Sequence, residues 1–432
     1  MVVVGGGLAG CEAAWQIARA NVHCILYEMR PHKQTPAHQT GDLAELVCSN
    51  SLGSLQENSA SGLLKAELSI MGSLLLDVAQ ASQVPAGHAL AVDRKEFSSR
   101  VEDALAGHPL IEICRQEVTS IPEGSAVVLA SGPLTSTDLA QDLQKLTGES
   151  MLHFYDAAAP LIQADSIDGE KTFRAGRHGG GDYINCPMNA EAYAHLVEEL
   201  NRAQRVVRRS FEPKELFAGC MPVEELAGRG LDTLRFGPLR PIGLVDPKTQ
   251  ERPHAVVQLR QDDRYGRLYN MVGFQTNLTW PEQRRVFRLI PGLEGAEFLR
   301  YGVMHRNTFV RAPHILNPAF ECRKRPGLFI AGQLSGAEGY VAAVATGLLC
   351  GVNAARRALE QPLLNWPVDT LTGALSNYVS QGPCRDFQPI NPNFGLLPLM
   401  AGGRKTRRPK QAYQALRSMR IFWSQLGNGR IL

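Results

Sequence analysis

The sequence contains no apolar run of the roughly 20 residues that a membrane-spanning helix requires, and its opening residues suit a strand rather than a secretory signal. Its nine cysteines are an odd number, and no two of them form a Cys-x-x-Cys pair. These absences argue against a membrane protein, a disulfide scaffold and a zinc-binding module. We therefore expect a cytoplasmic protein with reduced thiols and without a metal.

Acidic residues are missing from the last part of the chain, where none follows Asp386, although the net charge of the whole chain is only +3. A solvated basic tail explains this composition. A phosphate-binding surface for nucleic acid explains it equally well, and Phe422 and Trp423 nearby would suit such a surface. The basic residues concerned are Arg404, Lys405, Arg407, Arg408, Lys410, Arg417, Arg420 and Arg430.

The clearest motif that is present stands at the beginning of the chain. An apolar β-branched run at residues 2–4 leads into Gly5, Gly7 and Gly10, which fit Gly-x-Gly-x-x-Gly. A helix expected over residues 11–20 and a strand expected over 22–27 follow, and the strand ends at Glu28. Glycines in this spacing let a pyrophosphate approach the helix amino end, and the acid can hold ribose hydroxyls. The pattern predicts dinucleotide binding and leaves NAD and FAD both open.

A second nucleotide-domain pattern lies far along the chain. Residues 328–331 predict a strand that ends at Gly332, and residues 340–357 predict an Ala/Gly-rich helix that can pack closely on its neighbours. A dinucleotide fold completed by a distant strand and helix favours FAD over NAD. We also expect a helix over residues 63–80 and a buried strand over 126–130.

The fold class predicted from these patterns is α/β. It consists of a Rossmann-like FAD-binding domain of the glutathione-reductase type, formed by residues 1–134 and 309–365. A large α+β domain is inserted at residues 135–308, with helices expected over 190–203 and 281–289 and strands in "AVVQLRQ" and "RLYNMVGFQ". Residues 366–432 would form a basic C-terminal region that packs on the FAD domain.

Two cysteines differ from the small buried hydrophobe that a free cysteine usually is. Cys48 opens the polar loop "SNSLGS" shortly after the expected ribose-binding strand, where loops face the ligand cleft. Cys220 lies in "LFAGCMPVEEL", beside an expected helix start, which can lower the pKa of a thiol. For Cys11, Cys24 and Cys350 the buried, structural interpretation suffices.

Several long motifs resemble one known family. They are "YEMRP", "LVCSNSLGS", "INCPMN", "GCMPVEELAGRG", "RFGPLRPIGL", "LYNMVGFQTNLTW", "FLRYGVMHRNTF" and "LFIAGQLSGAEGYVAAVATGLL". Together they resemble the folate- and FAD-dependent tRNA (uracil-5-)-methyltransferases (TrmFO) of the MnmG/TrmFO flavoprotein group, from the first strand to about Arg357. The relatives that modify the wobble uridine share the glycine loop but have a larger C-terminal region.

The resemblance implies an activity and its ligands. The enzyme would methylate C5 of the T-loop uridine, position 54, in tRNA, with carbon from methylenetetrahydrofolate and electrons from NADH or NADPH through FAD. Its partners would be the tRNA T arm and the folate, and no obligate protein partner is inferred. The residues expected to bind FAD are Gly5, Gly6, Gly7, Leu8, Ala9, Gly10, Glu28, Met29, Arg30, Gly332, Gly339 and Tyr340.

The resemblance also places two functional thiols at Cys48 and Cys220. Methylation of uracil needs a nucleophile at C6, a base for the C5 proton and a hydride for the resulting methylene. We expect Cys220 to be the nucleophile and Cys48 the base, and the opposite assignment stays open. Candidates for folate or substrate contacts are Trp280, His305, Arg306 and Asn307, with Tyr340 as a further stacking candidate.

Three other functions remain as alternatives at this point. One is a flavoprotein that modifies the wobble uridine, against which the short C-terminal region argues. Another is a small-molecule FAD oxidoreductase, which would give the acid-free tail no purpose. The third is an RNA-binding protein that keeps FAD for structure. The candidate tRNA contacts are Arg404, Lys405, Arg407, Arg408 and Lys410.

Overall fold

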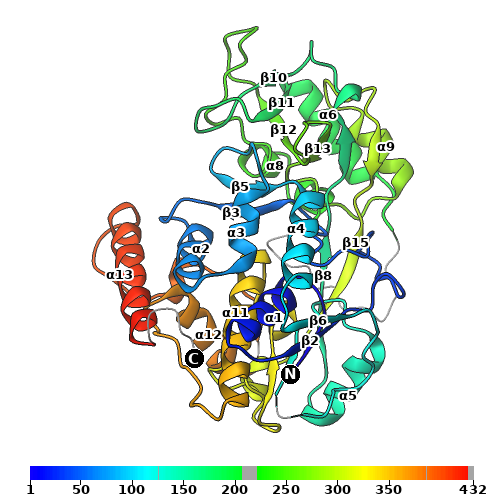
Figure 1. The fold of residues 1–432 in the computed structure, drawn as a ribbon. Coiled ribbons are helices and arrows are strands. Elements are labelled where there is room, and N and C mark those ends of the chain that lie inside the picture. The colour runs from blue at the N-terminus through cyan, green and yellow to red at the C-terminus, as the bar shows by residue number, and fades with distance from the viewer. Residues whose placement is uncertain (125, 207–220, 386, 427–432) are drawn as a thin grey trace.

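The computed structural model describes residues 1–124, 126–206, 221–385 and 387–426 (Figure 1). A five-stranded parallel sheet lies at the centre of the larger lobe, with the strand order β16-β7-β1-β2-β6. The predicted α/β class is confirmed. The strands of this sheet are β1 (Val2–Val4), β2 (Cys24–Tyr27), β6 (Ile111–Cys114), β7 (Val127–Leu129) and β16 (Leu328–Ile330).

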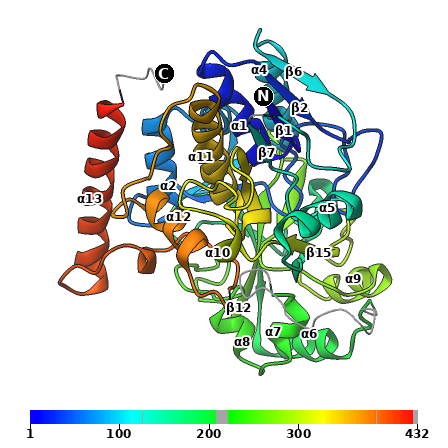
Figure 2. The ribbon, with the colours of Figure 1, turned by 90° about the horizontal axis from the view of Figure 1, so that it is seen from below.

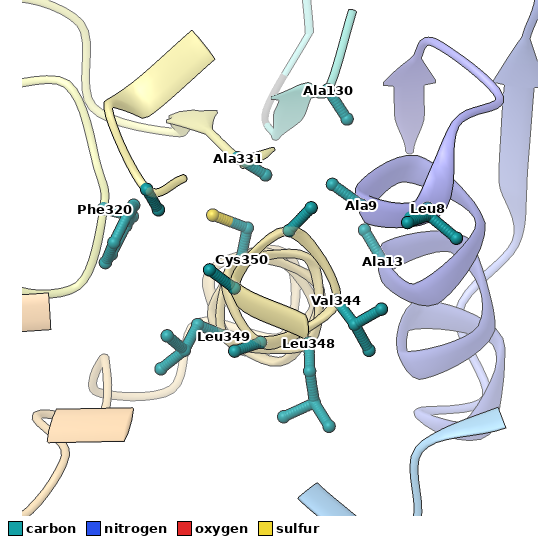
Figure 3. Close-up of a cluster of buried hydrophobic side chains, with 14 of the residues drawn as sticks. Leu8, Ala9, Ala13, Ala130, Phe320, Ala331, Val344, Leu348, Leu349 and Cys350 are labelled. Atoms are coloured by element: carbon teal, nitrogen blue, oxygen red, sulfur yellow. The ribbon is translucent and has the colours of Figure 1, made fainter. Parts of the chain in front are cut away.

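Two helices that are far apart in sequence pack side by side on this sheet. They are α1 (Leu8–Arg19) and α11 (Tyr340–Ala358), and Figure 3 shows their facing side chains. A Cβ at Gly347 would lie 2.3 Å from the backbone oxygen of Ala9, and one at Gly351 would lie 2.6 Å from that of Ala13. Only glycine permits this approach, so the Ala/Gly-rich composition of α11 brings the C-terminal part of the domain onto its first helix.

One expected helix is wrong. The stretch at residues 63–80 forms two helices, α2 (Ala60–Met71) and α3 (Leu74–Ala81), because Gly72 adopts a left-handed conformation with φ of +77°. The Ser73 side chain then accepts the backbone N–H of Leu76 and caps α3. The apolar spacing continues across this break, which explains why the pattern predicted a single helix.

The remaining elements of the larger lobe complete its core. A small antiparallel sheet has the strand order β3-β5-β4. The elements are β3 (Ser51–Ser54), β4 (Gln83–Val84), β5 (Ala89–Val92), α4 (Arg94–Ala106), α5 (Thr137–Thr147), α10 (Ala312–Ile315), η3 (Gly332–Ser335), α12 (Leu371–Gln381) and η4 (Phe394–Leu396).

The second lobe is a six-stranded sheet with helices and its own hydrophobic core, which includes Tyr193, Phe274 and Phe287. Its neighbouring strands pair antiparallel, and the strand order is β10-β11-β12-β13-β9-β14. Its elements are β9 (Leu161–Gln163), η1 (Ala164–Ser166), β10 (Phe173–Arg174), β11 (Tyr183–Met188), α6 (Ala190–Arg202), α7 (Val223–Ala227), α8 (Thr233–Phe236), β12 (Ala255–Gln261), β13 (Leu268–Met271), α9 (Trp280–Phe287) and β14 (Phe298–Arg300).

The two lobes are joined by a two-stranded antiparallel ribbon, formed by β8 (Leu152–Ala157) and β15 (Met304–Phe309). Helix α5 lies before this ribbon, and its Leu139 and Leu143 belong to the core of the larger lobe. We therefore propose that the inserted domain begins after α5 rather than at residue 135.

The acid-free C-terminal segment forms the long helix α13 (Arg404–Gln425), which packs against α2 at the edge of the molecule (Figures 1 and 2). Its apolar side is buried through Ala415, Met419 and Trp423. Trp423 is only 8% exposed and stacks on Trp366. Its ring is therefore unsuited to the base stacking that the sequence suggested. No helix in the described ranges is long and apolar enough to cross a membrane.

Candidate active site

A cleft of about 1680 Å³, counting the open space at its mouth, runs across the carboxyl ends of the parallel strands. It is lined by the glycine loop, the loop that carries Cys48, the segment after β7 and the start of α11, and the ribbon adds side chains from β8 and β15. Loops at this edge of a parallel sheet commonly form the ligand site. The candidate FAD residues that line it are Gly5, Gly7, Leu8, Ala9, Glu28, Met29, Arg30, Gly332, Gly339 and Tyr340.

The three motif glycines each have a distinct steric role. Gly5 has φ of +105°, which favours glycine, and a Cβ at Gly10 would lie 1.8 Å from the backbone oxygen of Gly5. At Gly7, by contrast, no described atom lies within 4 Å of the added Cβ. Gly7 is also the N-cap of α1, where unpaired backbone N–H groups attract anions. The open space at Gly7 therefore fits the close approach of a pyrophosphate.

Glu28 is buried at the end of β2 and is held in place by two neighbours. Its Oε2 accepts the backbone N–H of Gly6 at 2.8 Å, and its Oε1 accepts the Nε–H of Arg30 at 2.9 Å. Burial opposes ionisation, but the hydrogen bonds and charge of Arg30 outweigh it and keep the pKa of Glu28 below its ordinary value. Oε1 also accepts the backbone N–H of Arg30 at 3.0 Å, so Oε2 is the oxygen that keeps acceptor capacity for a ribose hydroxyl.

At the other end of the cleft, Cys48 lies against the first residue of α11. Its Sγ is 3.0 Å from the hydroxyl oxygen of Tyr340. That oxygen also accepts the backbone N–H groups of Cys48, at 2.9 Å, and of Ser49, at 3.2 Å. Because two N–H groups already point at the oxygen, the hydroxyl proton is the natural donor to the sulfur. The structure thus brings together two residues that the sequence analysis had singled out separately, Cys48 as a thiol and Tyr340 as a cofactor or stacking candidate.

The environment of Cys48 favours the neutral thiol. Burial, and then the charge of Asp156, raise the pKa of Cys48 to about 11, although the hydrogen bond from Tyr340 acts in the opposite direction. A second acid, Glu338, also lines the cleft and has its pKa raised to about 8 by burial and by Asp156. Both shifts favour the protonated forms of Cys48 and Glu338 at this end of the cleft.

The loop that carries Cys48 is fastened by the inserted lobe. Arg260 on β12 donates from Nη2 to the Ser49 hydroxyl at 2.7 Å and from Nε to Oδ1 of Asn50 at 3.0 Å. Arg94 forms a second link between the lobes through its ion pair with Asp262 at 2.8 Å. The position of the thiol therefore depends on both lobes.

The ribbon separates two hollows because successive side chains of a strand point to opposite faces. Asp156, His305 and Asn307 line the main cleft. Tyr155 and Arg306 line a second hollow on the other face, to which His305 also contributes. The sequence candidates His305 and Asn307 thus line the same cleft as Cys48, and Arg306 points away from it.

Other predicted residues lie elsewhere. Trp280 is absent from the described lining of both hollows; it is 58% exposed and stacks on Tyr301. Cys220 lies outside the described residues, so its relation to Cys48 stays a prediction. On α13, Lys405 and Lys410 are exposed, whereas Arg407 and Arg408 are partly covered. The side chain of Arg404 also lies outside the description.

Among the acids that line the cleft, sequence reasoning missed Glu338 and Asp156, whose charges act on Cys48. Glu338 directly precedes Gly339 at the start of α11, so its position in the motif could have drawn attention to it. Asp156 lies in a ribbon strand that the sequence did not predict, and only the pairing of β8 with β15 brings it to the cleft. Among the described residues, no group of three His, Cys, Asp or Glu side chains could hold a metal ion.

Comparisons with known proteins agree with this architecture. The family described as GIDA, glucose inhibited division protein A, matches residues 1–362. The chain is 54% identical over 435 residues to the methylenetetrahydrofolate--tRNA-(uracil-5-)-methyltransferase TrmFO of Desulforudis audaxviator, covering 99% of each chain. It is also 54% identical to the protein of that name from Geobacter sulfurreducens, covering 96% of this chain and 97% of that one.

A solved structure shares the fold at much lower identity. GidA of Aquifex aeolicus in its form I crystal superposes with a TM-score of 0.71 at 16% identity, covering 98% of this chain and 75% of that chain. The predicted FAD-domain fold, with its inserted lobe, is therefore one that a known structure contains.

Proposed function

Because this chain belongs to the TrmFO family of methylenetetrahydrofolate-dependent tRNA (uracil-5-)-methyltransferases, we propose that it methylates C5 of uridine in tRNA. The observation that carries the proposal is that one cleft contains both a dinucleotide cradle and the reactive-thiol candidate Cys48. We further propose the T-arm uridine at position 54 as the target, and NADH or NADPH as the source of electrons.

The residues of the cleft fit FAD. The open space at Gly7 and the helix end behind it would hold the pyrophosphate, and Glu28 would hold ribose hydroxyls. Gly332, Gly339 and Tyr340 also line the cleft, and we propose that the flavin ring lies beside Tyr340 and Cys48. Reduced FAD, when bound, supplies the hydride that turns a methylene group into a methyl group.

The thiols share the remaining chemistry. We propose that the Cys220 thiolate adds to C6 of uracil, so that C5 attacks the methylene carbon carried by the folate. Cys48 then accepts the C5 proton as the folate nitrogen leaves, and Cys220 departs from C6 when the methylene is reduced. Cys48 can accept this proton only as a thiolate, after its own proton has passed to solvent, and its raised pKa makes that thiolate strongly basic but scarce near pH 7. The opposite assignment would exchange the two roles.

The substrate needs a larger surface than the cleft alone. We propose that the exposed cations of α13, including Lys405 and Lys410, contact tRNA phosphates. His305 and Asn307 would contact the folate or the uracil from the ribbon. The wobble-uridine and small-molecule alternatives are not favoured, because the relatives named as uracil-5 methyltransferases match nearly the whole chain.

The test is carbon transfer by the purified, FAD-loaded protein. Tritium in the methylene group of methylenetetrahydrofolate should enter tRNA in the presence of NADH or NADPH, and nuclease digestion should release it as 5-methyluridine. A tRNA whose position 54 is cytidine is the matched control and should stay unlabelled. Labelling from S-adenosylmethionine instead of the folate would contradict the proposal.

The same protein can assign the thiols. RNA containing 5-fluorouridine should form a stable adduct with the protein, and Cys220→Ala should abolish it while Cys48→Ala retains it. If Cys48→Ala alone abolishes the adduct, the two roles are reversed.

A further inference from the structure

The inner face of the ribbon carries polar atoms that have no hydrogen-bond partner. Asn307 is fully buried, and neither Oδ1 nor Nδ2 of its carboxamide has a partner among the described residues. The Nδ1 atom of His305, two positions earlier, is in the same condition. A buried polar group left without a hydrogen-bond partner destabilises the folded protein. Both side chains line the cleft, so a bound molecule with its own donor and acceptor would satisfy them.

A carboxylate lies on the same face. Asp156 pairs directly with His305 across the ribbon, so their side chains point the same way, and Asp156 is 5% exposed. The hydrogen bond found for its carboxylate within the described ranges comes from the adjacent backbone N–H of Ala157, at 2.8 Å. Most of its capacity to accept hydrogen bonds therefore remains available, and it faces the end of the cleft where Cys48 lies.

The three flat rings of the proposed reaction differ in what they offer to a carboxylate. In uracil and in the flavin, the N3–H lies between two carbonyl oxygens, so a carboxylate aligned with that edge meets at least one acceptor. In the pterin of folate, the N3–H lies beside a 2-amino group, which gives two adjacent donors. A carboxylate matches two parallel donors with two charge-assisted bonds and repels a carbonyl oxygen.

Resting on the function proposed above, we propose that Asp156 recognises the 2-amino and N3–H edge of the folate pterin, with the Asn307 carboxamide as a second contact from the same face. This pairing selects the one-carbon donor over the other two rings that enter the cleft. In this proposal the ribbon does more than connect the two lobes, because the side chains on its inner face complete the folate site beside the larger lobe.

The experiment measures binding rather than turnover. Dissociation constants of tetrahydrofolate, and of an analogue that lacks the 2-amino group, are measured anaerobically by calorimetry on the FAD-loaded protein. The wild-type protein should bind tetrahydrofolate at least about tenfold more tightly than the analogue, since the analogue leaves one carboxylate oxygen unpaired. Asp156→Asn should lose at least about tenfold in affinity for tetrahydrofolate and bind both ligands alike.

Two further variants separate this contact from general damage. Asp165→Asn changes an exposed acid of the same lobe and should bind both ligands as the wild type does. Asn307→Leu keeps a similar volume without polar atoms and should weaken tetrahydrofolate binding while the flavin absorbance per protein stays constant. Should Asp156→Asn fail to retain FAD, equal binding of both ligands by the wild type still overturns the inference, and Asn307→Leu still tests the same face of the ribbon.

Equal binding of both ligands by the wild type, or undiminished selectivity in a folded Asp156→Asn, would overturn the inference. Methylene transfer to tRNA, measured on the same wild-type preparation, separates this failure from failure of the proposed function. If methylene transfer occurs but the wild type binds both ligands equally, the proposed function holds and the role of Asp156 is wrong. If the wild type prefers tetrahydrofolate but transfers no methylene group to tRNA, Asp156 keeps its role and the proposed function is wrong.

Discussion

The hydroxyl group of Tyr340 joins the first residue of α11 to Cys48 through contacts with both the backbone N–H and the Sγ of that cysteine, at 2.9 and 3.0 Å. The contact couples the helix that closes the FAD domain to the thiol proposed to carry out proton transfer. Its two partners are far apart in sequence, and each comes from a motif that the sequence had already marked as functional. Their joint role is open to direct test.

Replacing Tyr340 with Phe should make Cys48 less acidic. The variant removes the hydroxyl that donates to the sulfur, so the pKa of Cys48 should rise above its value of about 11. Alkylation by iodoacetamide, followed at the Cys48 peptide by mass spectrometry, should slow several-fold at pH 8, and methylation should fall by about 10- to 100-fold. Alkylation of the exposed Cys384 should be unchanged and provides the internal control.

The glycine loop offers a matched pair of substitutions. In Gly7→Ala the new methyl group meets open space, so the protein should fold and melt like the wild type but bind FAD at least about tenfold more weakly. In Gly10→Ala the methyl group would lie 1.8 Å from the backbone oxygen of Gly5, so the fold itself should suffer. Melting curves and flavin absorbance distinguish these outcomes. A Gly7→Ala protein with full FAD affinity would contradict the assigned pyrophosphate position.

The buried acid Glu338 should make the folded state sensitive to alkaline pH. Its folded-state pKa of about 8 lies above the ordinary value of 4.5, so the folded protein holds this proton more tightly than the unfolded chain. The corresponding stability is present below pH 4.5 and is lost as the pH rises towards 8. Glu338→Gln should therefore show a smaller fall in melting temperature between pH 5.5 and pH 8.5.

A second buried acid, Glu67, also contributes to the pH dependence of the melting temperature. Burial raises its pKa to about 7, so it contributes a dependence of the same sign in both proteins. The prediction concerns only the difference between wild type and Glu338→Gln. Identical pH dependences in the two proteins would show that Glu338 does not hold its proton in the folded state.

The cations of α13 should contribute affinity for tRNA without selecting its sequence. Replacing Lys405, Arg407, Arg408 and Lys410 together with Ala should weaken tRNA binding and reduce the steepness of its salt dependence. Filter binding at several salt concentrations measures both quantities. The double variant Lys248→Ala/Arg252→Ala, on exposed residues of the inserted lobe, is the control and should behave like wild type. An unchanged salt dependence in the fourfold variant would remove α13 from the binding surface.

Local patterns predicted the nucleotide-binding half of the fold well. The glycine spacing, the β-branched first strand and the small residues of α11 all act through backbone geometry, which a sequence shows directly. The expected strand at 328–331 and helix at 340–357 appear as β16 (Leu328–Ile330) and α11 (Tyr340–Ala358), within one residue at each end. The break at Gly72 was missed because apolar spacing is the same on both of its sides.

Contacts between distant residues were harder to foresee. Asp156 reaches the cleft only because β8 pairs with β15 in one register, and nothing near it in the sequence indicates that pairing. Trp280 shows the converse difficulty, because the sequence makes it a candidate for folate or substrate contact whereas in the structure its ring is 58% exposed and stacks on Tyr301. Residue type alone did not indicate which face of the molecule each side chain would occupy.

The attachment of the Cys48 loop to β12 has a consequence for engineering. Arg260 of the inserted lobe donates hydrogen bonds to Ser49 and Asn50, and Asp262 of the same lobe pairs with Arg94. Each of these contacts therefore joins one residue from each lobe. A hybrid that carries the inserted lobe of a distant homologue on this nucleotide-binding half should still bind FAD but should lose methylation activity, because the Cys48 loop loses its contacts with β12. Transplanting Arg260 and Asp262 with their partners as one unit is the condition under which such a hybrid should work.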